Sequence, residues 1–148
     1  MKEKDLTLAI ANAVTSSLQA NGISTVQTRT GDVVNAGTKL QWRLDIGKGA
    51  DIYVSIHINA STSAQPNGFK VYYNGAGKDL AGAISKANTL FKSLGVAPSP
   101  YYINKFKGPA VLVEAGFISN ASDRQLLQNR SAQIGKEIAS GIANYIKP

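Results

Sequence analysis

Cysteine is absent from this chain of 148 residues, and histidine, methionine and tryptophan occur once each. Without cysteine the chain can form neither disulfides nor thiolate metal sites. No apolar run approaches the roughly 18 residues of a membrane span. The first residues, MKEKDLTLAIANAV, lack the continuous apolar core of a signal peptide. We therefore expect no membrane span. Any role outside the cell then requires cytoplasmic synthesis followed by another export route or by phage-mediated release.

Acidic residues are scarce. The chain has 9 aspartates and glutamates and 16 lysines and arginines, which gives a net charge of +7. A basic protein can bind nucleic acid, anionic lipid or an anionic cell-wall polymer. The basic residues are scattered, and no arginine-rich arm or aromatic RNA-binding motif occurs. We therefore expect no nucleic-acid partner. A basic polyanion-binding module stays as a minor hypothesis, which salt-sensitive DNA binding in a gel shift would support.

The length and the 43% of apolar residues predict one domain over residues 1–148. Apolar residues at helical spacing alternate with runs rich in β-branched residues, which predicts a three-layer α/β/α domain with a mostly parallel twisted sheet. The expected helices cover residues 6–18, 35–49, 80–94 and 134–145, and the expected strands cover 23–29, 50–58, 68–74 and 109–117.

Two buried strands carry polar residues where ligands bind in such sheets, near the carboxyl ends of the strands. His57 ends the strand ADIYVSIHI, and Glu114 lies within the apolar run AVLVEAGF. A lone histidine is more often structural than functional. A buried carboxylate needs a cation, a metal or a proton. An ion pair between Glu114 and Arg43 or Arg29 is the structural alternative to a general base or acid with a raised pKa.

Glu3 precedes the first apolar helix, where an acidic side chain interacts favourably with the helix dipole. On the residues alone this structural interpretation is preferred. Histidine and carboxylates can also bind a divalent metal, and catalytic zinc usually takes three protein ligands. The sequence offers His57 and Glu3 and no clear third ligand.

Five stretches occur in an order that resembles the type-3 N-acetylmuramoyl-L-alanine amidases, zinc-dependent cell-wall hydrolases of bacteria and phages. They are KEKDLTLAIA, Thr28-Arg29, Arg43, ADIYVSIHINA and PAVLVEAGFISN. The resemblance covers nearly the whole chain, and SIHINA together with VEAGFISN is specific. It implies that the substrate is peptidoglycan, that the site of action is the cell wall, and that the bond cleaved joins the lactyl group of muramic acid to L-alanine.

The resemblance also implies roles for individual residues. Glu3 and His57 correspond to zinc ligands, and Glu114 corresponds to the catalytic glutamate that accepts a proton from zinc-activated water. Asn59 would line the groove beside the metal, and Arg43 is a further substrate-binding candidate. Tyr101 and Tyr102 occupy a loop, shortened here, where the family often carries an arginine.

The family begins with a strand ending in Gly-His-Gly, whose histidine is the first zinc ligand, and this chain begins at Met1 just before the Glu3 stretch. Three accounts are open: a truncated amidase, a strand supplied by another chain or a second open reading frame, or a weaker metal site completed by a carboxylate. We expect self-association or a complementing N-terminal segment. The leading hypothesis is a zinc-dependent amidase. The alternative is a non-catalytic relative that binds muropeptide or regulates a partner amidase.

Overall fold

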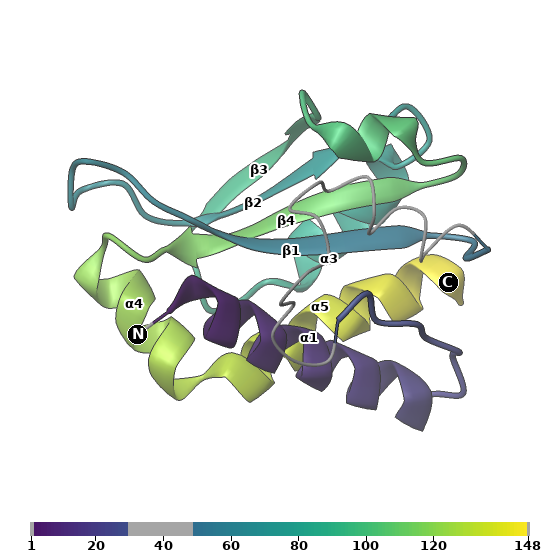
Figure 1. Cartoon of the computed structure of the whole chain (residues 1–148), viewed down its shortest axis with the longest axis horizontal. Coiled ribbons are helices and arrows are strands. Elements are labelled where there is room, and N and C mark those ends of the chain that lie inside the picture. The colour runs from purple at the N-terminus through teal and green to yellow at the C-terminus, as the bar shows by residue number, and fades with distance from the viewer. Residues whose placement is uncertain (1, 30–48, 148) are drawn as a thin grey trace.

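The computed structural model describes residues 2–29 and 49–147, in which helices pack against a four-stranded sheet (Figure 1). This arrangement confirms the predicted α/β fold class. In chain order the elements are α1 (Glu3–Ala20), β1 (Tyr53–Asn59), β2 (Phe69–Tyr73), α3 (Lys78–Ala87), β3 (Ser93–Pro98), the 3-10 helix η1 (Tyr102–Lys105), β4 (Ala110–Phe117), α4 (Ala121–Asn129) and α5 (Ser131–Ile146). None of the described helices is both long and apolar enough to cross a bilayer.

The strand order is β1-β4-β2-β3 within the described residues. β1 pairs with β4 in parallel and β2 pairs with β3 in parallel, whereas β2 and β4 are antiparallel. The predicted mostly parallel sheet is therefore confirmed. β4 lies between two strands and is buried along most of its length, which explains its nearly continuous apolar run. β1 lies at the edge of this sheet, with β4 as its only described partner.

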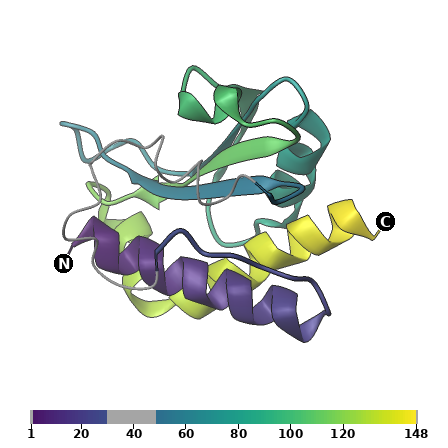
Figure 2. The same ribbon diagram turned by 45° about the vertical axis from the view of Figure 1, so that its right-hand side comes forward.

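Helix α1 forms because apolar residues recur every four positions, and all four are buried: Leu6, Ile10, Val14 and Leu18. α1 lies alongside α5 below the sheet in both views (Figures 1 and 2). Gly135 of α5 permits this close approach, since a Cβ atom there would collide with the Ala13 side chain. The two helices and the sheet enclose the main core.

The two faces of the sheet have different surroundings. The main core lies on the helix face, where residues of β2 and β4 pack with residues of α1, α3, α4 and α5. A smaller cluster lies on the opposite face and joins Tyr53 and Leu112 of the sheet to Ile103 and Phe106. Among the described elements, the short helix η1 is the one that covers part of this second face (Figure 2). Side chains there can reach solvent.

Two local predictions were wrong. Residues 23–29 form no strand, because they pair with no described strand; Val26 is 71% exposed, and Gln27 bonds through its side chain to Asn12 of α1. The predicted helix 80–94 ends at Ala87, because the Asn88 side chain binds both backbone groups of Phe91 and turns the chain into β3. The predicted helix at 35–49 lies almost entirely outside the described residues.

Candidate active site

Three side chains with ionisable groups form a row across neighbouring strands. His57 of β1 is in register with Glu114 of β4, and Glu114 is in register with Lys70 of β2. Residues that are directly opposite in a sheet project from the same face, and neighbouring strands are about 4.8 Å apart. The row lies on the second face, which η1 covers only in part. The sheet therefore brings together the two site residues predicted from separate strands and adds a lysine.

Glu114 has the electrostatics of a proton-transfer group. It is only partly exposed, and its Oε2 atom is buried without a hydrogen-bond partner. Burial, and then the charge of Glu3, raise the pKa of Glu114 from its ordinary 4.5 to about 7. Arg29, one of the two arginines considered as an ion-pair partner, donates instead to the Lys4 carbonyl and the Thr7 hydroxyl of α1. At neutral pH the carboxyl group can both accept and release a proton.

The His57 ring contacts the Ser55 hydroxyl, which in turn contacts the Tyr102 hydroxyl. Its Nε2 atom lies 2.9 Å from the Ser55 Oγ atom, and that oxygen lies 2.7 Å from the Tyr102 hydroxyl. Ser55 is buried. When the serine hydroxyl accepts from Nε2, the imidazole carries its lone pair on Nδ1, the form in which that atom can ligate a metal. Side chains alternate between the two faces along β1, so Ser55 projects from the same face as His57. This alternation is the feature of the sequence from which Ser55 could have been predicted.

Glu3 lies in the first turn of α1 and is exposed. It is close enough to Glu114 to contribute to its raised pKa. Glu3 and His57 also line one cavity of about 1250 Å³ between α1, β1 and residues 23–29. Within residues 2–29 and 49–147, no three His, Asp or Glu side chains gather as a metal-binding group. The described donors therefore supply two zinc ligands at most, and a full zinc site would need a further donor.

The other predicted site residues have mainly local contacts. The Asn59 side chain accepts from the Ala60 backbone N–H, and its carbonyl accepts from the N–H of Ile118. Gly116 lies two residues after Glu114 in β4. It has φ +80°, and the Phe91 ring lies where its Cβ would be, with the nearest carbon at 2.6 Å. Arg43 lies outside the described residues.

An aromatic pair adjoins the row. The Tyr72 and Tyr101 rings meet edge to face with centroids 5.2 Å apart, and the Lys70 Nζ atom lies 5.2 Å from the centre of the Tyr72 ring. Burial, then Tyr72 and Glu114, raise the pKa of Tyr101. Lys70 and Tyr72 could not be placed at the site from the sequence, because alternation in a strand does not say which strand lies beside it.

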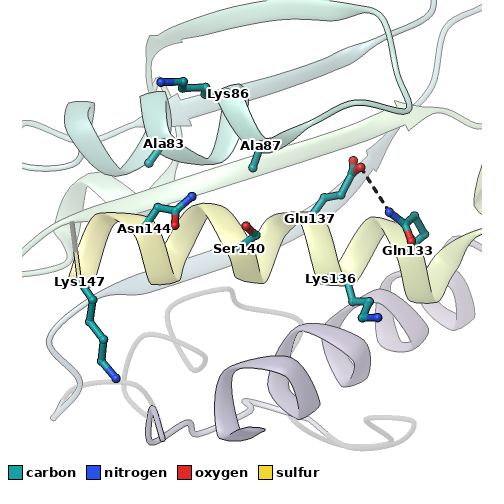
Figure 3. A pocket seen from close by; sticks show the side chains of 9 residues that line it. All are labelled: Ala83, Lys86, Ala87, Gln133, Lys136, Glu137, Ser140, Asn144 and Lys147. Carbon is teal, nitrogen blue, oxygen red and sulfur yellow. Dashed lines mark hydrogen bonds between the residues drawn. The ribbon is translucent and has the colours of Figure 1, made fainter. Parts of the chain in front are cut away.

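A second hollow, of about 780 Å³, lies between α3 and α5, away from this row. Figure 3 shows Asn144 and Glu137 of α5 directed toward α3, with the Gln133 amide donating to Glu137 at 3.5 Å. Lys136 and Lys147 point away from α3 in the same view (Figure 3). The lysines therefore do not converge on this hollow, and the row on the sheet remains the candidate site.

Comparison with protein families gives a match over residues 1–144 to the Amidase_3 family, described as N-acetylmuramoyl-L-alanine amidase. The chain is 37% identical to the N-acetylmuramoyl-L-alanine amidase LytC of Bacillus subtilis, over 98% of this chain and 31% of that protein. It is 35% identical to the probable cell wall amidase LytH of Staphylococcus aureus, over 86% of this chain and 44% of that protein. The chain thus spans less than half the length of either relative.

Solved structures are similar over nearly the whole chain. The N-acetylmuramoyl-L-alanine amidase AmiC2 of Nostoc punctiforme superimposes with a TM-score of 0.91 at 31% identity, over 99% of this chain and 85% of that one. The catalytic domain of CwlV, an amidase from Bacillus (Paenibacillus) polymyxa, gives a TM-score of 0.88 at 30% identity, over 97% and 84%.

Proposed function

The chain belongs to the N-acetylmuramoyl-L-alanine amidase family, and from that premise we propose that it hydrolyses the amide bond between the lactyl group of N-acetylmuramic acid and L-alanine in peptidoglycan. The observation that carries this proposal is Glu114, a partly buried carboxyl group with a pKa of about 7 and one unpartnered oxygen, in register with His57. A group that titrates near the working pH is suited to move a proton in both directions.

Glu114 would act twice in this reaction. As a carboxylate it accepts a proton from the water whose oxygen attacks the lactyl carbonyl carbon. As a carboxylic acid it then donates that proton to the alanine nitrogen when the carbon–nitrogen bond breaks. Ser55, whose hydroxyl also bonds to Tyr102, holds the His57 ring in one orientation. Asn59 and Arg43 remain proposed contacts for substrate.

Zinc enters the proposal through Glu3 and His57, which line the same cavity. A bound zinc ion would polarise the carbonyl and make the attacking water more acidic. Because the described residues supply two candidate ligands, we expect zinc affinity well below that of a three-ligand site. Titration calorimetry with zinc, compared with Glu3→Gln and His57→Ala variants, measures this directly. Identical binding by all three proteins would remove both residues from the metal site.

The activity test is release of stem peptides from purified peptidoglycan with zinc added. We expect release by the native chain and loss of release in Glu114→Gln. Glu137→Gln is the matched control, since it makes the same change of charge on α5, where Glu137 bonds to Thr89. Equal release by Glu114→Gln and the native chain would contradict the role of Glu114. No release by any protein, with muropeptide still bound, would favour a non-catalytic or regulatory relative.

One edge of β1 has no paired strand among residues 2–29 and 49–147, which bears on the partners of the chain. Among the described strands only β4 pairs with β1, and the large cavity lies on the other side of β1. An unpaired strand edge presents backbone groups that can pair with another strand. We therefore propose self-association or a complementing segment at this edge. Light scattering should detect assemblies larger than one chain. A monodisperse monomer whose β1 amides exchange slowly with solvent would contradict this.

The cell wall is the proposed site of action, because it is where peptidoglycan, the proposed substrate, is found. The route of delivery, by export or by phage-mediated release, is part of the same proposal. Fractionating the source cells and probing for the chain measures it, and a chain confined to the cytoplasm under all growth conditions would contradict it.

A further inference from the structure

Lys70 is a cation beside the proposed catalytic carboxyl group and is not paired with it. The residue is in register with Glu114, yet Glu114 Oε2 has no hydrogen-bond partner, and the lysine does not figure among the causes of the raised Glu114 pKa. Among the residues that the structure describes, Lys70 has no ion pair. Its ammonium group lies over the ring of Tyr72, two residues further along the same strand.

This arrangement keeps the Lys70 ammonium group apart from the Glu114 carboxyl group on the same face of the sheet. Tyr72 is in register with Leu112, one step down β4 on the same face as Glu114, so the ammonium group is drawn away from the Glu114 carboxyl group. A cation held against an aromatic face keeps its other donors directed elsewhere. Lys70 is only partly exposed, which strengthens its attraction for an anion compared with a fully exposed lysine.

We propose that Lys70 is a specificity-determining residue that binds a free carboxylate of the stem peptide, the α-carboxylate of the residue that follows L-alanine. This inference rests on the proposed function. In peptidoglycan that residue is a γ-linked D-glutamate whose α-carboxyl group is either free or amidated. Two extended residues span about 7 Å, which is of the order of one strand spacing plus part of a lysine side chain. An amide bond at Glu114 therefore places that carboxylate within reach of Lys70.

Tyr72 and Tyr101 position the lysine in this proposal. Their edge-to-face contact fixes the Tyr72 ring, and this ring in turn holds the ammonium group. Tyr101 is 42% exposed, so its ring also offers an apolar wall next to the bound peptide. An amidated substrate would offer Lys70 a neutral group in place of a charged acceptor. The free acid adds a charge–charge attraction to the ammonium group that the neutral amide lacks, so the free acid is preferred.

The test compares two probes, N-acetylmuramoyl-L-alanyl-D-isoglutamate and its isoglutamine analogue, by titration calorimetry. All binding is measured in the Glu114→Gln protein, called the parent, because it should bind the probes without cleaving them. The further substitutions are added to this parent. We expect the free acid to bind about tenfold tighter than the amide. Adding Lys70→Gln should abolish the preference, and adding Lys70→Arg should keep it. Lys92→Gln, an exposed lysine outside the row, should leave it unchanged. Circular dichroism verifies that each variant folds.

Hydrolysis gives a second readout with Glu114 intact. Lys70→Gln should raise KM for the free acid with little change in kcat, because the lysine binds a group remote from the reacting bond. Equal binding of the two probes by the parent, binding of neither, or a preference that survives in Lys70→Gln overturns the inference. A different result would show that the proposed amidase activity is wrong: the native chain would bind the free acid selectively but would never cleave it.

Discussion

Replacing Glu114 with glutamine should make the folded protein more stable at pH 8 and leave its stability unchanged at pH 4. Burial and the nearby Glu3 raise the pKa of Glu114 from 4.5 to about 7 in the folded chain. Between these two values the unfolded chain has lost its proton while the folded chain retains it. The free energy of unfolding of the native protein therefore falls as the pH rises through this window. Glutamine has no such titration.

The size of the effect follows from the same two pKa values. A change from 4.5 to about 7 corresponds to roughly 3 kcal/mol at 1.36 kcal/mol per unit. Because Glu114 keeps some contact with solvent, screening reduces this to about 2 kcal/mol. The advantage of Glu114→Gln should thus grow from about zero at pH 4 to about 2 kcal/mol at pH 8.

Urea unfolding followed by circular dichroism at pH 4, 6 and 8 measures this difference, with a chelator present so that no bound cation offsets the charge. Glu137→Gln is the control, and its difference from the native protein should not vary in this way. A constant difference across the pH range, or a less stable Glu114→Gln at pH 8, would refute the reasoning. The expected result would mean that the folded chain keeps a costly carboxyl group for its chemistry.

Three further substitutions test contacts within the fold and at the site. Asp123→Ala should lower the free energy of unfolding by about 2–3 kcal/mol in urea titrations, because the buried carboxylate accepts from two backbone N–H groups at 2.8 and 2.9 Å; an unchanged midpoint would contradict this. Gly116→Ala should lower the free energy of unfolding in urea by about 1–3 kcal/mol, because residue 116 has a left-handed backbone and a Cβ there would clash with Phe91. An unchanged free energy of unfolding would mean that the Phe91 ring moves freely. Ser55→Ala should leave the melting temperature nearly unchanged and lower peptide release about tenfold, since His57 loses the hydroxyl that orients it; full activity would show that this contact is dispensable.

Elements with a strong local pattern could be predicted from the residues. The four-residue spacing from Leu6 to Leu18 indicated α1, and the β-branched runs indicated β1 and β4. Asparagine is a common residue at a helix N-terminus, and the Asn120 side chain accepts from the backbone N–H of Asp123 at the start of α4. In each case the signal lies within a few residues, because helix periodicity, strand composition and capping are local properties.

Segments whose conformation depends on a neighbour were predicted less well. Residues 23–29 have the composition of a strand but pair with no described strand, and Leu94 continues an apolar helical spacing yet lies in β3. A strand exists only where another strand supplies its hydrogen bonds, and apolar spacing alone cannot say whether that partner is present.

The residues alone indicated an α/β domain, named His57 and Glu114 as candidates, and through the family resemblance suggested Glu3 and zinc. Only the tertiary structure decided that His57, Glu114 and Lys70 lie in one row, that Ser55 holds the imidazole, and that Lys70 turns toward Tyr72. The reason is physical. Strand order and register arise from contacts between segments far apart in the chain, and a shift of one residue would place each of these side chains on the other face of the sheet.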